Sequence, residues 1–216
     1  TSLPRRELAA AGIDTIPIVV DGRSTDGTRA LARAMGARVV VQGHVGKGSG
    51  LREVIPRLES DYAVMIDADG TYPTDAIPEV VRLLRRGCDV VIGSRLAGRI
   101  DDGAMPGLHR LGNRILTALA NILYPSGRTT DVCTGLWGFR VEALKRLHLT
   151  ADGFELEADL YTESVLHGLR FGEIPIRYTP REGFAKLSWE DGLRIAWLML
   201  SKRILRTRKR HGDHVV

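Results

Sequence analysis

Cysteine and long apolar runs are both scarce in this sequence. Its two cysteines, Cys88 and Cys133, lie far apart and outside any metal-ligand spacing, which predicts reduced thiols rather than a zinc site or a disulfide framework. The apolar stretch at residues 195–200 is far shorter than the roughly 20 residues that a helix needs to span a bilayer. No signal-peptide pattern opens the chain. We therefore expect a cytoplasmic protein without a transmembrane segment.

Lysine is also scarce, although the chain is basic. Only five of its 31 basic residues are lysines, so a lysine within a motif is more informative than an arginine. The formal net charge of +5 indicates an anionic partner. No recognised nucleic-acid-binding motif accompanies this charge, so nucleic acid is not an expected partner. With 216 residues, 44% of them hydrophobic, the chain fits one globular domain with a sizeable core.

Short β-branched runs alternate with helical patterns over the first 95 residues. The near-continuous apolar character of these runs is typical of strands that are buried on both faces of a parallel sheet. We therefore predict an α/β, Rossmann-like fold with a mostly parallel central sheet flanked by helices, and ligands beyond the carboxyl ends of the strands. Asp26 and Asp75 are expected to cap two of the helices. The predicted strands are residues 15–20, 37–41, 62–66 and 89–92, and the predicted helices are residues 26–35, 50–58 and 75–86.

The second half of the chain is less regular. Its patterns predict helices at residues 109–123, 155–167 and 191–206 and strands at residues 135–140 and 172–178. We interpret residues 1–216 as a single domain. It comprises a nucleotide-sugar half at about 1–95, an acceptor half at 96–190 and a basic amphipathic C-terminal helix at 191–216.

The strongest chemical signal is Asp67-Ala68-Asp69 at the end of a predicted strand. Side chains alternate along a strand, so Asp67 and Asp69 point the same way. Two carboxylates on one side can hold a hard divalent cation together with water and diphosphate oxygens. The apolar run before the pair, and Gly70 and Pro73 after it, favour this interpretation over two acids in a solvated turn. The pattern predicts a Mg²⁺ or Mn²⁺ site.

Two other segments are weaker candidates for contacts with the donor. Asp21 ends the first predicted strand and can accept hydrogen bonds from a base or ribose, whereas helix capping explains residues 24–26. Lys47 lies in a Gly-rich segment at residues 46–50 that departs from the Walker pattern. This segment is either a loop that brings one cation to a diphosphate or a solvated loop.

Basic residues gather towards the C-terminus. Arg181 and Lys186 stand five positions apart in a Gly-containing loop, which either closes over a charged leaving group or is solvated. The tail at residues 194–210 interleaves basic and apolar residues, which is typical of an amphipathic helix on an anionic membrane surface. The alternative is that the apolar side of this helix packs on the core and its basic side is solvated.

The order of these motifs resembles that of family 2 glycosyltransferases of the GT-A fold. The resemblance covers residues 15–195, and its first half rests on residues 19–28, 46–48, 67–69 and 93–95. The second half is similar to dolichol-phosphate mannose synthases and polyprenyl-phosphate glucosyltransferases. The motifs that carry this similarity are residues 111–117, 131–140, 154–157, 174–178 and 181–187.

The resemblance implies a role for each matching position. Asp67 and Asp69 would bind the metal and, with Ala68, the donor diphosphate. Asp21 would lie by the donor nucleotide, and Arg181 with Lys186 would clamp the diphosphate. The lipid-phosphate site would be lined by Arg95, Arg110 and Asn113.

The sequence departs from the family pattern at three places. The family's first strand is absent, and residues 1–14 stand where its following helix and loop should be, so we expect this strand to be missing from the chain. Gly22 replaces the usual second aspartate after the first visible strand, and Thr71 stands where many relatives have a glutamine metal ligand. Base recognition by Asp21 and a third metal ligand are the features that these departures affect.

The expected reaction is inverting transfer of a hexose, with mannose favoured, from a nucleoside-diphosphate sugar to a polyprenyl or dolichyl phosphate. GDP-mannose is the first expected donor and UDP-glucose the second, both on resemblance. Phosphate monoesters have a second pKa of about 6, so the acceptor is already ionised and needs no base. Asp131 is a candidate for orienting the acceptor, or the base if the acceptor is a hydroxyl group.

Two other functions remain open on the sequence. One is transfer to a soluble hydroxyl acceptor, such as a small phosphorylated acid or a glycan. The other is a non-catalytic module that binds a membrane surface and carries a degenerate donor site. For the enzyme, we expect a peripheral position on the cytoplasmic face of a membrane.

Overall fold

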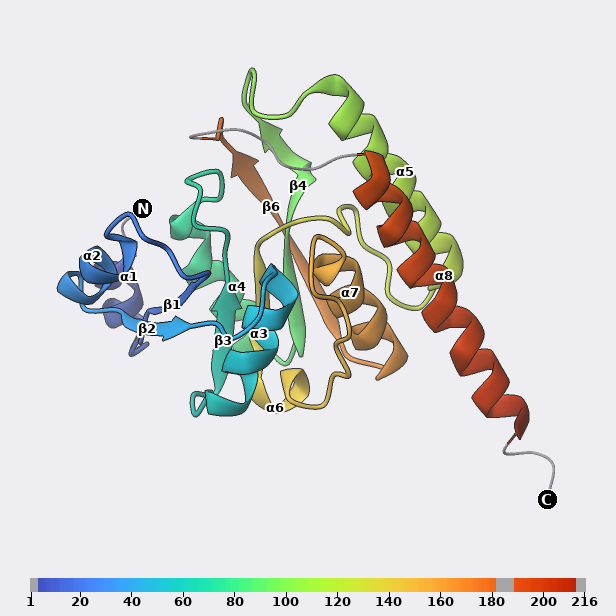
Figure 1. Ribbon diagram of the computed structural model, residues 1–216, viewed down its shortest axis with the longest axis horizontal. Helices are drawn as coiled ribbons and strands as arrows, with labels where there is room; N and C mark the ends of the chain where they lie inside the picture. Colours follow the sequence, from blue (N-terminus) through green and yellow to red (C-terminus); the bar gives the residue numbers. More distant parts are fainter. Residues whose placement is uncertain (1–3, 182–188, 213–216) are drawn as a thin grey trace.

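The computed structural model describes residues 4–181 and 189–212, and its strands form two sheets (Figure 1). The strands are β1 (Ile18–Asp21), β2 (Arg38–Val41), β3 (Tyr62–Met65), β4 (Val90–Ile100), β5 (Trp137–Arg140) and β6 (Phe171–Tyr178). The α-helices are α1 (Arg5–Ala10), α2 (Thr28–Ala34), α3 (Lys47–Val54), α4 (Ile77–Arg85), α5 (Gly107–Leu123), α6 (Val141–Leu144), α7 (Leu156–Leu166) and α8 (Trp189–Gly212). Two 3-10 helices, η1 (Ile55–Arg57) and η2 (Thr74–Ala76), follow α3 and precede α4.

The larger sheet has four strands in the order β3-β5-β4-β6. β5 runs antiparallel to both β3 and β4, and β4 runs parallel to β6. Three of the four strands therefore share one direction, which agrees with the mostly parallel sheet that the sequence predicts. β1 and β2 pair in parallel as a separate two-stranded sheet, with Ile18 opposite Arg38 and Asp21 opposite Val41.

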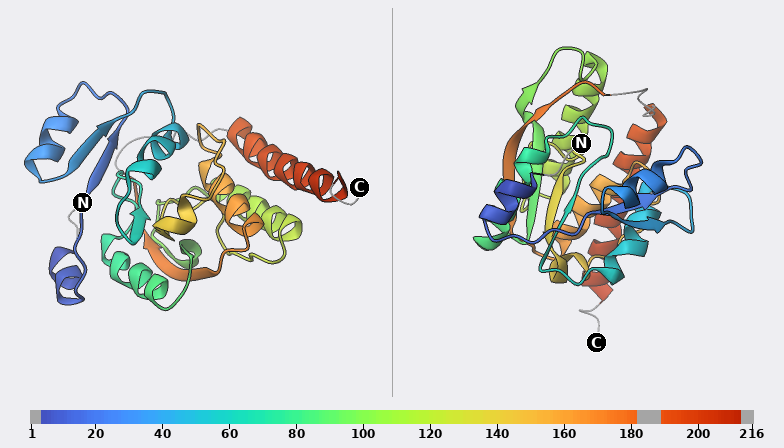
Figure 2. Two further views of the ribbon diagram at one scale, coloured as in Figure 1. Left: turned by 90° about the horizontal axis from the view of Figure 1, so that it is seen from below. Right: turned by 90° about the vertical axis from the view of Figure 1, so that its left-hand side faces the viewer.

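Helices cover both faces of the four-stranded sheet (Figure 2). On one face, Val80 and Leu84 of α4 pack with Val91 of β4. On the other face, Val90 and Ile92 of β4 join a larger core cluster with residues of α5, α7 and α8. Because successive strand residues point to opposite faces, the apolar run of β4 serves both clusters. This arrangement is the reason that its sequence lacks a polar alternation.

Helix α8 is attached to α5 and α7 along one side. Ile195 and Met199 are buried, and the hydroxyl of Tyr124 in the segment after α5 donates to the Met199 carbonyl over 2.7 Å. The Lys202 ammonium lies 2.7 Å from a carboxylate oxygen of Glu163 in α7. None of the helices in the described ranges combines the length and apolar composition needed to cross a bilayer.

The predicted elements are present, with three local differences. β4 continues to Ile100 because it pairs with β6 beyond a register shift between Ser94 and Arg99. The N-cap of α2 is Gly27 rather than Asp26, although the Asp26 carboxylate does accept the Thr28 amide over 3.1 Å. Asp75 lies inside η2, and α4 is capped by Ala76.

Candidate functional site

The acidic pair lies directly after β3, at the carboxyl end of that strand. The side chains of Asp67 and Asp69 are 27% and 24% exposed, so both reach solvent. One oxygen of Asp69 accepts hydrogen bonds from the amide of Thr71 over 3.1 Å and from its hydroxyl over 2.6 Å. Thr71 itself is fully buried. Thr71 therefore positions Asp69 through these two hydrogen bonds.

A basic side chain contacts each of the two acids. The Arg181 guanidinium lies 2.9 Å from the second oxygen of Asp69. The Lys47 ammonium lies 2.5 Å from Asp67 Oδ1 and also 2.5 Å from Glu157 Oε1. The structure thus brings together four of the residues assigned to the donor site. Lys186, the other predicted clamp residue, lies outside the described residues.

The charge of Lys47 is stabilised by its two carboxylate partners. Burial disfavours the charged ammonium, but the attraction of Glu157 and Asp67 outweighs this effect and raises the pKa of Lys47 above its usual range. Burial also raises the pKa of the Glu157 carboxyl, while Lys47 opposes that shift. Lys47 is therefore permanently protonated beside the acidic pair.

The first turn of α3 sets the position of Lys47. Gly46 precedes the helix with a φ of 113°, a value that favours glycine. A Cβ atom at Gly46 would collide with the Asp152 carbonyl group, and one at Gly48 would collide with the Ala151 carbonyl group. The Gly48 amide donates to the Asp152 carbonyl over 2.9 Å. The glycines therefore allow close packing, and residues 46–50 are the start of a helix rather than a loop.

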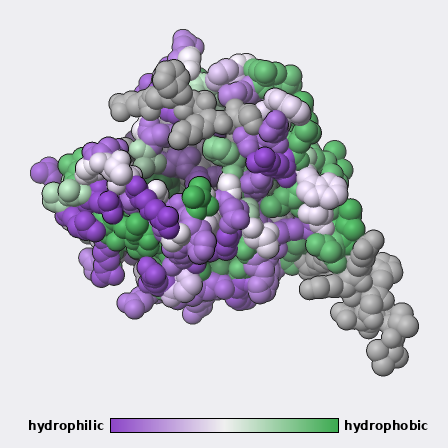
Figure 3. All heavy atoms as spheres, viewed as in Figure 1, coloured by the Kyte–Doolittle hydropathy of each residue, from purple (hydrophilic) through white to green (hydrophobic). Residues whose placement is uncertain are grey.

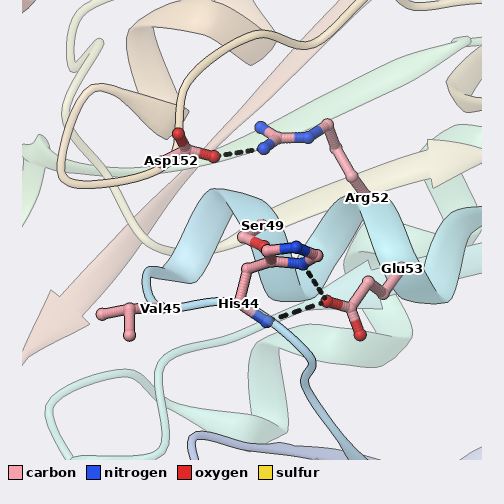
Figure 4. Close-up of a pocket in the computed structure, with 6 residues that line it drawn as sticks. All are labelled: His44, Val45, Ser49, Arg52, Glu53 and Asp152. Carbon is pink, nitrogen blue, oxygen red and sulfur yellow. Dashed lines mark hydrogen bonds and ion pairs between the residues drawn. The ribbon is translucent and has the colours of Figure 1, made fainter.

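A pocket adjoins this helix, as Figure 4 shows. On one side Arg52 reaches across to Asp152, and on the other the His44 ring and amide face Glu53. The charged side chains that line the pocket are thus already paired with one another. Their pairing fixes α3 against the segment before α7, and so supports the placement of Lys47.

The wall behind Asp67 is formed by Gly135. A Cβ atom at Gly135 would collide with the Asp67 carboxylate, and it would come closest to Oδ2. The Gly135 amide donates to the hydroxyl of Tyr72 over 2.6 Å. Glu157, Tyr72 and Gly135 had no assigned role in the sequence analysis. The signal that was available for Gly135 and Glu157 is their position inside motifs at residues 131–140 and 154–157.

Arg95 and Asp131, which the sequence assigns to different roles, form a buried ion pair. Arg95 Nε lies 2.7 Å from Asp131 Oδ2, and a terminal guanidinium nitrogen lies 2.8 Å from Oδ1. The Arg95 amide also donates to Asp131 over 3.0 Å, and Asp131 has no exposed surface. Both carboxylate oxygens are therefore bonded to Arg95, which itself lies 5.4 Å from the ring centre of Tyr178.

The other predicted acceptor residues lie on α5. Arg110 is exposed, whereas Asn113 is buried and its amide faces the Met105 sulfur over 3.6 Å. Among the residues that the structure describes, no hydrogen bond or ion pair joins either of them to Arg95. Their grouping in one phosphate site therefore stays a prediction.

Asp21 ends β1 and is almost fully buried. Its Oδ2 accepts the Ser24 amide over 3.0 Å and lies 3.7 Å from the Arg29 guanidinium. Hydrogen bonding by Ser24 holds the pKa of the Asp21 carboxyl below its usual range. Its Oδ1 is buried and accepts no hydrogen bond from the part of the chain that the structure describes. The contact of Asp21 with a base or ribose therefore stays a prediction.

The acidic pair fits a hard divalent cation. The described residues contain no group of three or more histidine, cysteine, aspartate or glutamate side chains that could hold a metal ion. A cation held by Asp67 and Asp69 would take its remaining ligands from water and substrate oxygens. Mg²⁺ is commonly bound in this way, by one or two carboxylates together with phosphate oxygens and water.

The fold and the site together define a class of protein. It is an α/β protein with two acids and two basic side chains at the carboxyl end of β3, the end at which the strands of such sheets bind ligands. Residues 16–148 match the family described as Glycosyl transferase family 2, and the chain belongs to this family. The family that the motifs predicted is confirmed.

Curated relatives support the same family. Glycosyltransferase AglJ of Haloferax volcanii is 38% identical over 76% of this chain and 54% of its own length. The dolichyl-phosphate hexose transferase of the same organism is 35% identical over 79% of this chain and 72% of the relative. An undecaprenyl-phosphate mannosyltransferase of Micrococcus luteus is 30% identical over 61% and 56% of the two chains. This chain thus spans about half the length of several relatives.

Solved structures confirm the predicted GT-A fold. Glucosyl-3-phosphoglycerate synthase from Mycobacterium tuberculosis, in complex with Mn²⁺, UDP and glucosyl-3-phosphoglycerate, superposes with a TM-score of 0.67 at 22% identity. The superposition covers 88% of this chain and 69% of the synthase. At this identity the likeness concerns the fold alone.

Proposed function

We propose that the chain is the glycosyltransferase domain of an enzyme that moves a hexose from a nucleoside-diphosphate sugar to a polyprenyl or dolichyl phosphate, with inversion. The observation that carries this proposal is the pair Asp67 and Asp69 at the end of β3, with Lys47 and Arg181 in contact with it. A site with these charges can bind a diphosphate through a cation and through its own basic side chains. The names of the polyprenyl-phosphate relatives support the acceptor class.

The leaving diphosphate is the group that this site is suited to stabilise. A Mg²⁺ or Mn²⁺ ion on Asp67 and Asp69 would neutralise part of the charge that develops on the diphosphate. Arg181 and Lys47 supply two further positive charges from opposite sides of the pair. Asp21, whose buried Oδ1 accepts no hydrogen bond from the described residues, is proposed to accept one from the base or ribose. Lys186 is proposed as a second clamp residue next to Arg181.

Asp131 has a positioning role in this proposal, since an ionised acceptor phosphate needs no general base. Its bonds to Arg95 fix the guanidinium midway along β4, at the register shift that follows Ser94. We propose that Arg95 approaches the acceptor phosphate with its remaining donor capacity, together with Arg110 and Asn113 of α5. Because Asp131 is fully buried, it orients the acceptor through Arg95 rather than by direct contact.

The lipid part of the acceptor is proposed to lie near an apolar surface on α5 and α8. Each helix carries large exposed apolar side chains at helical spacing, and Figure 3 shows apolar residues along the edge that these helices form. Exposed arginines, Arg110 and Arg114 on α5 and Arg194 and Arg203 on α8, lie among them. The apolar residues are Leu108, Leu111, Ile115 and Ile122 on α5, and Trp189, Leu193, Trp197, Ile204 and Leu205 on α8.

This surface supports the proposal that the chain binds the cytoplasmic face of a membrane. Apolar side chains flanked by arginines suit the boundary of a bilayer, and anionic lipids of the cytoplasmic leaflet attract the basic groups. Arg110 and Asn113 lie on α5, the helix that also carries part of the apolar surface. A lipid phosphate could therefore reach them while its chain stays in the bilayer.

The donor is proposed to be GDP-mannose, with UDP-glucose as the second choice. The mannosyltransferase name of one relative supports the first. The solved structures with UDP and UDP-glucose support the second. A panel of nucleotide sugars, assayed with Mg²⁺ or Mn²⁺ and a short polyprenyl phosphate, tests both. We expect labelled hexose in the organic phase with one donor; labelled product that stays in water with every donor would contradict the lipid acceptor.

A soluble hydroxyl acceptor is the second candidate function. Complexes of the structurally similar synthase with phosphoglyceric acid favour it. The same panel, supplied with phosphorylated acids in place of the lipid, separates the two candidates. A non-catalytic module would bind neither GDP nor UDP in the presence of Mn²⁺, which calorimetry measures.

A further inference from the structure

Lys47 forms an ion pair with Asp67, one of the two acids that a divalent cation would need. Its ammonium lies 2.5 Å from Asp67 Oδ1. The other oxygen of Asp67, Oδ2, backs against Gly135, where a Cβ atom would collide with it. A cation that approaches Asp67 from the side away from Gly135 therefore meets Oδ1 together with the Lys47 ammonium. The two positive charges compete for one carboxylate oxygen.

Glu157 offers the same ammonium a second anchor. It lies in the first turn of α7, its side chain is 11% exposed, and its Oε1 is 2.5 Å from Lys47 Nζ. A buried carboxylate without a partner is strongly unfavourable, so Glu157 needs a positive charge beside it. Lys47 can therefore leave Asp67 without leaving the site, because Glu157 retains it.

The backbone around Lys47 is rigid on both sides. The first turn of α3 is packed without space for a Cβ atom against the segment before α7, and the Gly48 amide is bonded to that segment. Glu157 follows in α7 itself. The backbone that carries Lys47 is thus packed against the segment that leads to Glu157, and only the ammonium has to move.

We propose that Lys47 is a resident counter-ion of the acidic pair, which a divalent cation displaces from Asp67, and that Glu157 is the positioning residue that holds the displaced ammonium beside the diphosphate. This inference rests on the proposed function, since it assumes a cation on Asp67 and Asp69. It adds a role for Glu157 and a reason for cooperative binding. The cation frees the ammonium, and the diphosphate gives the ammonium a new acceptor, so each ligand favours the other.

The test measures binding of Mn²⁺ alone to the full chain, by the electron paramagnetic resonance signal of the free ion. Removal of the competing charge in Lys47→Met is expected to tighten Mn²⁺ binding by about tenfold, because one repulsion at short range is lost. Glu157→Gln is expected to weaken it, because the ammonium then has no anchor other than Asp67. The two substitutions should thus change the affinity for Mn²⁺ in opposite directions. A general loss of packing around the ion pair would not produce this result.

Control variants test whether the changes in Mn²⁺ binding are specific to Lys47 and Glu157. Lys145→Met removes a lysine that bonds the Leu58 carbonyl, and Glu142→Gln neutralises an exposed acid of α6. Neither is expected to change Mn²⁺ binding. Lys47→Arg keeps the charge and should stay close to the unsubstituted chain. Lys47→Gln replaces Lys47→Met if thermal unfolding shows that the methionine variant is not folded.

Repeating the titrations with GDP or UDP separates the two proposals. We expect Mn²⁺ and the nucleotide to strengthen each other's binding in the unsubstituted chain, and to do so less in Lys47→Met. If the unsubstituted chain binds neither nucleotide with Mn²⁺, the proposed function and this inference both fail. If it binds them, but Lys47→Met and Lys47→Gln leave the affinity for Mn²⁺ alone unchanged or weaker, the counter-ion role alone is overturned.

Discussion

Two ion pairs of this protein have similar chemistry and opposite access to solvent. Arg95 and Asp131 form what we call the sealed pair, because their side chains are only 8% and 0% exposed and both oxygens of the acid are bonded. Lys47 and Asp67 lie at the sheet edge with side chains 35% and 27% exposed. A buried pair holds the fold together only as long as both partners are present. An open pair can exchange one partner for a ligand.

The largest expected effect is on the open pair. Asp67→Asn should lower the transfer rate on the order of a thousandfold, because the charge that helps to hold the cation at the leaving group is lost. Stability should change little, since Lys47 keeps Glu157 as a partner. Transfer assays and thermal unfolding of the same preparations check both parts. Near-normal turnover would contradict the assignment of the cation site.

Substitution in the sealed pair should lower stability, which substitution in the open pair is not expected to do. Asp131→Ala is expected to cost about 3 kcal/mol of unfolding free energy, because it leaves the Arg95 charge buried without a partner. The double variant Arg95→Met with Asp131→Leu removes both charges and should recover much of this loss. Denaturant unfolding measures the three proteins. An Asp131→Ala variant as stable as the unsubstituted chain would show that the pair is not structurally important.

Gly135 lies against Asp67 of the open pair, and a substitution there should have an intermediate effect. In Gly135→Ala the new methyl group would collide with the Asp67 carboxylate. We expect about a tenfold loss of transfer rate, as misplacement of a catalytic group by about 1 Å costs up to a hundredfold. Gly112→Ala on α5 is the matched control, because a Cβ atom there meets nothing within 4 Å. Equal activity of the two variants would argue against a tight wall behind Asp67.

The sequence predicted the fold well because the relevant signals are local. Each predicted strand and helix corresponds to an observed element, since apolar runs and helical periodicity mark buried strands and amphipathic helices directly. Asp67 and Asp69 were found because they follow such a run. The order of strands was not predictable in detail, because the insertion of β5 between β3 and β4 depends on long-range pairing.

The partners of the site residues could not be predicted from the sequence. Glu157 is 110 positions from Lys47, and Asp131 is 36 positions from Arg95. Contacts at such separations follow from how α3, α7 and the sheet pack together, and a single sequence carries no record of this packing. The Gly-rich segment at Lys47 was interpreted as a loop for the same reason. Its glycines accommodate a neighbouring backbone that is distant in the sequence.

The contrast between sealed and open positions also holds on α8, where the smallest effect is expected. Met199 is fully buried and Trp197 is 69% exposed, although they are two residues apart. Trp197→Ser should weaken binding to anionic vesicles by roughly fivefold, because an interfacial tryptophan buries part of its apolar surface in the bilayer. Stability should be unchanged, because this side chain contributes little to the core.

Leu31→Ser on α2 is the control for this prediction. Leu31 is 63% exposed but lies on the helix beside the two-stranded sheet, far from α8 in Figure 1. Vesicle flotation with anionic and with neutral lipids measures both variants. If Leu31→Ser loses as much binding as Trp197→Ser, or if neutral vesicles bind as well as anionic ones, the α5 and α8 surface is not the membrane contact. Its exposed apolar residues would then fit a protein partner better than a charged bilayer.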